Sequence, residues 1–151
     1  NPQLAEAFKV DEDHAKKVSS ILGDPNRYKI LVAEDSPLIR RLIQDALAEG
    51  GFHNVELVGH GKAAWDRLND EDDHFDLLIT DIEMPKLDGL SLTRKVKESP
   101  RHKDIPVIVF SSIVAEDIKR KAQSVGAEAQ ISKPEIPFLV ETVARLLKGR
   151  E

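Results

Sequence analysis

The sequence predicts an α/β protein with a doubly wound, five-stranded parallel sheet and one extra helix at the N-terminus. Five short apolar runs alternate with five helical patterns, an order typical of parallel sheets covered by helices on both faces. Three of the runs are nearly continuous, as expected of strands buried on both sides. At 151 residues, the chain can form one domain with a single hydrophobic core.

The N-terminal segment differs from the rest of the chain. We expect a helix over residues 11–22, because its apolar residues share one face and three acidic residues occupy its first turn, where the helix dipole favours them. The sequence at 23–26 then forms a turn. The predicted organisation is therefore a linker and helix over 1–26 and the main domain over 27–151. The apolar residues of this helix are Val18, Ile21 and Leu22.

Five predicted strands follow, each rich in Val and Ile or too short to form a helix. They cover residues 29–33, 55–58, 75–80, 105–110 and 129–132.

A helical pattern follows each predicted strand. The first helix has Pro37 in its first turn and Gly50 beyond its end, positions at which these residues are favoured. The third stops before Pro100, the fourth ends at Gly126 and the fifth ends near Gly149. The apolar positions that define the five patterns are Leu38, Ile39, Leu42, Ile43, Ala46 and Leu47; Ala64 and Leu68; Leu92 and Val96; Val114, Ile118, Ala122 and Val125; and Leu139, Val143, Leu146 and Leu147.

The composition excludes several classes of function. With 22 Lys and Arg against 27 Asp and Glu, the net charge of −5 disfavours binding to nucleic acid or to an anionic membrane surface. The absence of Cys excludes disulfides, iron–sulfur clusters, cysteine-ligated zinc and cysteine nucleophiles. No apolar stretch approaches the roughly 18 residues of a membrane span, so we expect no membrane insertion and a cytoplasmic location. Because the chain begins at Asn1 rather than Met, we expect it to be part of a longer protein.

Polar residues follow four of the five predicted strands. The first strand ends in Glu34 and Asp35, the third in Asp81, the fourth in Ser111 and the fifth in Lys133. In open α/β sheets, ligands bind beyond the carboxyl ends of the strands, near the point where the strand order reverses. We therefore expect these side chains to form one site, with Asp81 at the tip of the central strand.

Three carboxylates in one site require compensating charge. Two unit charges about 4 Å apart repel by roughly 4 kcal/mol at an effective dielectric constant near 20. Lys133 supplies one positive charge, and an oxygen-only ligand set favours Mg²⁺ over zinc. A carboxylate can attack phosphorus, so we interpret the site as one for Mg²⁺-dependent phosphoryl transfer to Asp81, with Lys133 and Ser111 contacting phosphoryl oxygens. The alternative for any single acid is a structural salt bridge.

The motifs at these strand ends resemble the receiver domain of bacterial two-component response regulators over residues 29–148. That family has the flavodoxin-like strand order 2-1-3-4-5. The resemblance implies a phosphoacceptor signalling domain rather than a true enzyme, with only self-catalysed phosphoryl transfer and slow autodephosphorylation. The motifs are Ala33-Glu34-Asp35-Ser36, Thr80-Asp81-Ile82-Glu83-Met84-Pro85-Lys86-Leu87-Asp88-Gly89, Ser111-Ser112 and Ser132-Lys133-Pro134.

The resemblance also implies roles for the acidic residues. A histidine kinase would donate a phosphoryl group to Asp81. Asp35 and Asp81 would bind Mg²⁺ directly, with the backbone carbonyl of Glu83, and Glu34 would act through a water molecule. Glu34 replaces the Asp that is more frequent in the family, and its longer side chain is expected to shift the carboxylate outward.

Two further features of the family concern the switch. Lys133 would precede a cis peptide bond to Pro134, which only X–Pro bonds adopt at low cost. Ser111 would turn toward the phosphoryl group and signal its presence. Gln130 stands where the best-known single-domain chemotaxis regulators carry an aromatic residue coupled to Ser111, so the sequence leaves the form of this switch open.

Residues 33–37 and 125–136 are most similar to the receiver half of CheV, a chemotaxis protein group that joins a CheW-like coupling domain to a receiver. This likeness implies that residues 1–26 are the end of such a coupling domain or its linker. It also implies a CheA-like kinase as phosphodonor, with the chemoreceptor array or coupling proteins as partners and protein contacts as the output.

Two alternative functions remain open from the sequence. One is a phosphate-independent pseudo-receiver that serves as an interaction module, although Asp35, Asp81 and Lys133 are all present. The other is a phosphatase with an Asp nucleophile, because Glu83 lies two residues after Asp81, where such enzymes place a general acid. The Asp-x-Asp-x-Thr pattern of those enzymes is missing.

Overall fold

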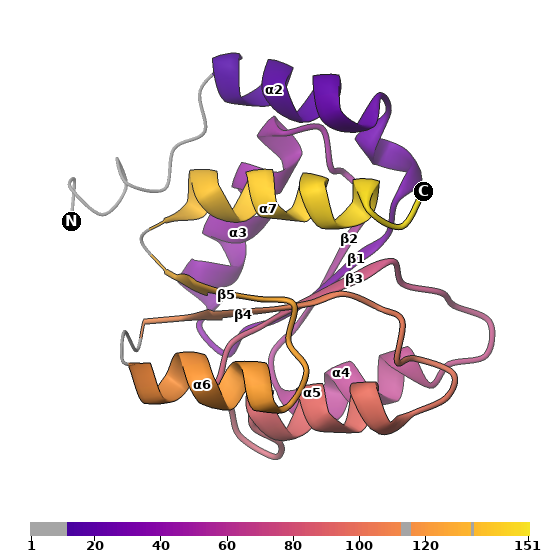
Figure 1. Cartoon of the computed structure of the whole chain (residues 1–151), viewed down its shortest axis with the longest axis vertical. Coiled ribbons are helices and arrows are strands. Elements are labelled where there is room, and N and C mark those ends of the chain that lie inside the picture. Colours follow the sequence, from indigo (N-terminus) through magenta and orange to yellow (C-terminus); the bar gives the residue numbers. More distant parts are fainter. Residues whose placement is uncertain (1–11, 113–115, 134) are drawn as a thin grey trace.

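Five parallel strands form the centre of the computed structural model, which describes residues 12–112, 116–133 and 135–151. The strand order is β2-β1-β3-β4-β5, and helices cover both faces of the sheet (Figure 1). The predicted doubly wound sheet and its strand order are therefore confirmed.

The strands are short and most are fully buried. β1, β3 and β4 are buried along their whole length. β3 and β4 each begin two residues later than predicted. The apolar pattern included Phe75 and Ile105, which are buried but precede the strands. The strands are β1 (Ile30–Ala33), β2 (Val55–Val58), β3 (Leu77–Thr80), β4 (Val107–Ser111) and β5 (Ala129–Ser132).

Helices α3 and α7 lie on one face of the sheet, and α4, α5 and α6 lie on the other (Figure 1). Ser36 caps α3 by accepting a hydrogen bond from the backbone N–H of Ile39, and Asp88 caps α5 in the same way through Ser91. None of the helices in the described ranges is long and apolar enough to cross a membrane. The helices are α2 (Glu12–Leu22), α3 (Pro37–Glu49), α4 (Gly61–Leu68), α5 (Gly89–Glu98), α6 (Glu116–Ser124) and α7 (Ile136–Lys148), with the 3₁₀ turn η1 (Pro25–Arg27).

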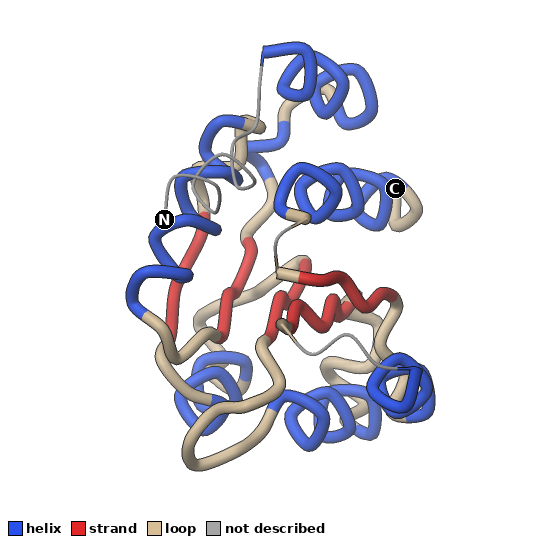
Figure 2. Tube along the Cα trace, turned by 90° about the vertical axis from the view of Figure 1, so that its left-hand side faces the viewer, coloured by secondary structure: helices blue, strands red, loops and turns tan. Residues whose placement is uncertain are grey.

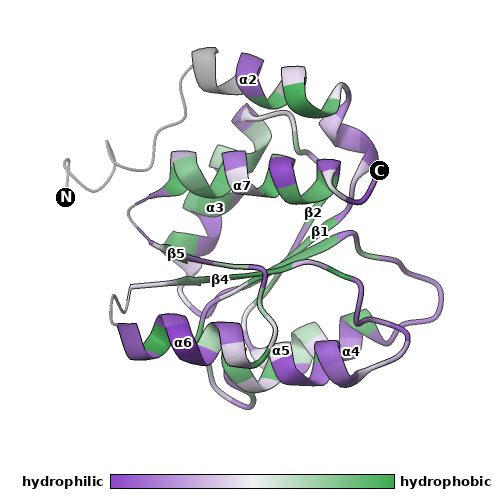
Figure 3. Cartoon of the chain, in the orientation of Figure 1, coloured by the Kyte–Doolittle hydropathy of each residue, from purple (hydrophilic) through white to green (hydrophobic). Residues whose placement is uncertain are grey.

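The core lies on both sides of the sheet, because successive strand residues point to opposite faces. In β1, Ile30 and Val32 pack toward α3 and α7, whereas Leu31 and Ala33 pack toward α4 and α5. Apolar residues accordingly concentrate in the strands and on the inner sides of the helices (Figure 3). This two-sided burial explains why β1, β3 and β4 are nearly continuous apolar runs in the sequence.

The predicted N-terminal helix packs on the outer side of α7 (Figure 2). Val18 is fully buried and Leu22 is nearly so, and both belong to the core on the α3–α7 side of the sheet. The Lys17 ammonium lies 2.8 Å from the Glu141 carboxylate on α7. Helix α2 therefore contributes side chains to the same core as the sheet, while the domain boundary after residue 26 stays a prediction.

Candidate functional site

The predicted site residues meet at the carboxyl edge of the sheet. A pocket of about 180 Å³ opens there and is lined by residues that follow β1, β3, β4 and β5. The pocket is thus lined by most of the polar residues that follow the predicted strands. The lining residues are Asp35, Asp81, Glu83, Ser111, Ser112 and Lys133.

Asp81 is buried at the end of the central strand, β3, with only 6% of its surface exposed. Its backbone N–H donates to the carbonyl of Ala33 at 2.9 Å, which extends the pairing of β3 with β1 by one residue. One carboxylate oxygen, Oδ1, accepts a hydrogen bond from the backbone N–H of Ile82 at 2.8 Å, and Oδ2 accepts one from Lys133 Nζ at 3.2 Å. The carboxylate is therefore held on two sides.

The loop after Asp81 folds back closely over it. The N–H of Gly89 donates to the carbonyl of Ile82 at 2.8 Å. A Cβ on Gly89 would lie 1.7 Å from the carbonyl oxygen of Asp81, a distance that no side chain can adopt. The absence of a side chain at Gly89 thus allows α5 to begin directly beside the candidate phosphoacceptor.

Glu34 is turned inward, and the expected outward shift of its carboxylate is wrong. Only 1% of the residue is exposed. Its Oε1 lies 2.7 Å from Lys133 Nζ, and its Oε2 accepts a hydrogen bond from the backbone N–H of Ser36 at 3.0 Å. The longer side chain therefore reaches Lys133 instead of solvent.

Two pKa values in the site are shifted upward, that of Glu34 mainly by burial and that of Lys133 by the neighbouring carboxylates. Burial raises the pKa of Glu34 to about 7, against the opposing effects of Lys133 and of the Ser36 N–H, and the nearby charge of Asp81 adds to the rise. Burial acts to lower the pKa of Lys133, but the carboxylates of Glu34 and Asp81 outweigh it, so that this pKa lies above its ordinary value. Lys133 therefore stays charged between the two carboxylates.

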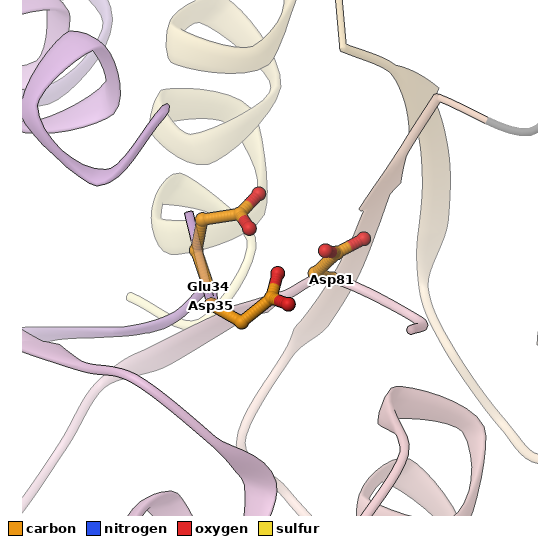
Figure 4. A group of neighbouring side chains, drawn as sticks. All are labelled: Glu34, Asp35 and Asp81. Atoms are coloured by element: carbon orange, nitrogen blue, oxygen red, sulfur yellow. The ribbon is translucent and has the colours of Figure 1, made fainter. Parts of the chain in front are cut away.

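Glu34, Asp35 and Asp81 form a candidate metal site. Each can offer one carboxylate oxygen such that the three oxygens lie within 4.8 Å of one another. Figure 4 shows their side chains at one end of the sheet, with the carboxyl groups of Glu34 and Asp35 turned to the side where Asp81 lies. Glu34 and Asp81 are buried and Asp35 is exposed. The oxygen donors suit a hard divalent cation such as Mg²⁺.

The other predicted residues occupy different positions around this pocket. Glu83 is exposed and Ser111 is buried, and both line it. Gln130 lines a second cavity of about 270 Å³ between α6, β5 and α7, and its Nε2 is buried without a hydrogen-bond partner among the described residues. The predicted cis bond to Pro134 lies outside the described residues.

Sequence reasoning missed one residue that contacts the acidic turn. Arg40, on the first turns of α3, donates from Nη1 to the carbonyl oxygen of Glu34 at 2.7 Å. The available signal was weak, because Arg40 and Arg41 are adjacent and a sequence pattern cannot say which of two neighbouring arginines reaches the loop.

Comparison with known proteins gives one family. The response regulator receiver domain matches residues 30–144. The gliding motility regulatory protein of Myxococcus xanthus is 37% identical over 122 residues, which cover 80% of this chain but only 15% of that protein. Chemotaxis protein CheY1 of Helicobacter pylori is 33% identical over 121 residues, which cover 80% of this chain and 97% of that protein.

Solved structures agree with this match. The receiver domain of Francisella response regulator 1452 has a TM-score of 0.75 at 28% identity, covering 82% of this chain and 99% of that one. The phosphorylated cyanobacterial phytochrome response regulator RcpA has a TM-score of 0.72 at 27% identity (82% and 96% covered). The Mn²⁺-bound form of response regulator Rcp1 has a TM-score of 0.69 at 25% identity (77% and 91% covered). None of these proteins is a CheV, so that finer resemblance is not confirmed.

Proposed function

Because the chain belongs to the response regulator receiver domain family of two-component signalling, we propose that it accepts a phosphoryl group on Asp81 in a Mg²⁺-dependent reaction and signals through protein contacts. The observation that carries this proposal is the position of the Lys133 ammonium, 2.7 Å from Glu34 and 3.2 Å from Asp81, at the edge of a pocket with three carboxylates.

The chemistry follows from the charges in the pocket. A carboxylate oxygen of Asp81 attacks the phosphorus of a phosphohistidine, the new P–O bond forms as the P–N bond breaks, and the imidazole leaves with the electron pair. Lys133 balances the negative charge of the phosphoryl oxygens. Ser111, at the end of β4, provides a hydroxyl for the same group. Water later hydrolyses the acyl phosphate and returns Asp81 to its free form.

A magnesium ion would be held by Asp35 and Asp81, with Glu34 acting through water and the backbone carbonyl of Glu83 as a further ligand. When bound, the ion supplies positive charge that lowers the repulsion between these carboxylates and an incoming phosphoryl group. Two similar proteins support this assignment, because one was solved as a phosphorylated form and another with Mn²⁺ bound.

The partners are proposed from the family and its chemotaxis members. A histidine kinase, CheA-like if the pathway is chemotaxis, would donate the phosphoryl group, and coupling proteins or the chemoreceptor array would receive the signal. Residues 1–26 would then be the end of a CheW-like coupling domain or its linker, and the protein would act in the cytoplasm without nucleic acid.

Intact mass spectrometry after incubation with acetyl phosphate and Mg²⁺ tests the proposed function. We expect one phosphoryl adduct on the wild-type chain, no adduct on Asp81→Asn, and loss of the wild-type adduct when EDTA replaces Mg²⁺. Asp88→Asn is the control, because this exposed acid caps α5 outside the pocket and should keep the adduct.

Two results would contradict the proposal. Absence of both a phosphoryl adduct and a beryllofluoride adduct would favour a phosphate-independent interaction module. Repeated turnover of a small phosphomonoester, lost in Asp81→Asn, would instead favour a phosphatase.

A further inference from the structure

We propose that Arg40 is a positioning residue that holds the turn after β1 in the conformation in which Asp35 binds the metal ion. The inference rests on the proposed function and extends it to a residue outside the pocket. Arg40 Nη1 donates to the carbonyl oxygen of Glu34 at 2.7 Å and to that of Asp35 at 3.4 Å. One guanidinium nitrogen thus contacts the backbone of both members of the acidic pair.

Asp35 depends on this backbone contact more than Glu34 does. The Glu34 carboxylate is held directly by the Ser36 N–H and by Lys133. By contrast, the Asp35 side chain is exposed, and no described residue forms a hydrogen bond or ion pair with its carboxylate. The position of Asp35 therefore depends on its backbone, and Arg40 contacts that backbone at two neighbouring carbonyl groups.

Arg40 itself is held on a rigid element beside a space left by a glycine. Its backbone N–H donates to the carbonyl of Ser36 at 2.9 Å, in the first turn of α3, and its side chain is half-buried. A Cβ on Gly59, directly after β2, would lie 3.1 Å from Arg40 Nη1. The end of β2, which carries no reactive group, thus leaves space for the guanidinium group of Arg40.

The direction in which Mg²⁺ affinity changes when Arg40 is replaced distinguishes a positioning role from a purely electrostatic one. If Arg40 acted only through its positive charge, removing that charge would make the pocket more negative, and Mg²⁺ would bind more tightly. If Arg40 positions the acidic turn, its removal lets the turn move and Mg²⁺ binds more weakly. Partners that orient metal ligands typically contribute about 10- to 100-fold in affinity.

Isothermal titration calorimetry with Mg²⁺, without a phosphodonor, tests the inference. We expect Arg40→Gln to weaken Mg²⁺ binding by about 10-fold, and Arg40→Lys to restore part of it. Arg41→Gln is the matched control: it removes the same charge from the same helix, but Arg41 is 75% exposed and faces Asp45 at 3.6 Å. Its Mg²⁺ affinity should equal or exceed that of the wild type.

Gly59→Ala provides an independent route, because it displaces the guanidinium without removing it and should weaken Mg²⁺ binding by a smaller factor. Gly59→Ala also tests the inference if Arg40→Gln does not fold, which circular dichroism in EDTA would reveal.

Mg²⁺ affinity in Arg40→Gln equal to or above that in Arg41→Gln overturns the positioning role. The phosphoryl adduct on wild-type Asp81 would then leave the proposed function intact. If the wild type binds no Mg²⁺ and forms no adduct, both fail together.

Discussion

At the scale of single residues, the most informative contact in the site is the one between Glu34 and Lys133. The side chain of Glu34 is long enough to reach the ammonium that also contacts Asp81, and it is buried in doing so. Burial favours the neutral form of a carboxyl group, which raises the pKa of Glu34 to about 7. Without a metal ion, one acid of the cluster can therefore keep its proton near neutral pH, and this lowers the repulsion among the three.

This raised pKa predicts a specific pH dependence of stability. Between pH 4.5, the ordinary pKa, and pH 7, the unfolded chain releases the Glu34 proton while the folded chain keeps it. The contribution of Glu34 to the free energy of unfolding is therefore complete below pH 4.5 and is lost as the pH rises to 7. In urea denaturation with EDTA, this effect should lower the free energy of unfolding of the wild type by up to about 3 kcal/mol over that pH range. Glu34→Gln should remove this part of the decline.

Glu83→Gln is the control for this measurement, because Glu83 is an exposed acid in the same pocket and its substitution should leave the decline in place. An unchanged pH dependence in Glu34→Gln would contradict the assignment of the decline to Glu34.

At the scale of elements, α2 is the addition to an otherwise regular alternation of strands and helices. It packs against α7, which begins soon after Lys133, and it buries Val18 and Leu22 in the core shared by α3 and α7. Helices in proteins gain most of their stability from packing an apolar face rather than from intrinsic propensity. We therefore expect α2 to unfold together with the sheet.

Val18→Ala tests the role of α2 in the fold. It removes two buried methyl groups and should lower the free energy of unfolding by roughly 2 kcal/mol in urea denaturation. Lys16→Ala, on the exposed side of the same helix, should change it by less than about 0.5 kcal/mol. If the two variants unfold at the same urea concentration, α2 is not part of the cooperative unit.

At the scale of the whole molecule, binding of a metal ion in the acidic pocket would be linked to folding. The pocket exists only when β1, β3, β4 and β5 are paired, so a cation that binds it stabilises the folded chain alone. At a concentration 100 times the dissociation constant, such a ligand adds about 2.7 kcal/mol.

Thermal unfolding in Mg²⁺ and in EDTA measures this linkage. We expect the wild type to unfold at a higher temperature in Mg²⁺, and Asp35→Asn to lose most of the difference. Asp45→Asn, which changes an exposed acid on α3, should keep it. An equal response of Asp35→Asn and the wild type would show that Mg²⁺ stabilises the protein elsewhere.

The alternation of strands and helices and the polar residues at the strand ends follow from the amino-acid sequence alone, and the family resemblance adds the strand order. These are local properties: apolar runs, caps and turns depend on neighbours in the chain. They placed Asp35, Asp81, Ser111 and Lys133 at one edge of the sheet, because parallel strands share a carboxyl end.

The contacts between residues far apart in the chain are seen only in the folded structure. It brings the Glu34 carboxylate to Lys133, places Arg40 rather than Arg41 within hydrogen-bond distance of the Glu34 carbonyl, and packs α2 on α7. Such contacts depend on side-chain length and on the space left by other elements, such as the missing Cβ of Gly59. A pattern along the chain carries no information on that space until the elements are packed.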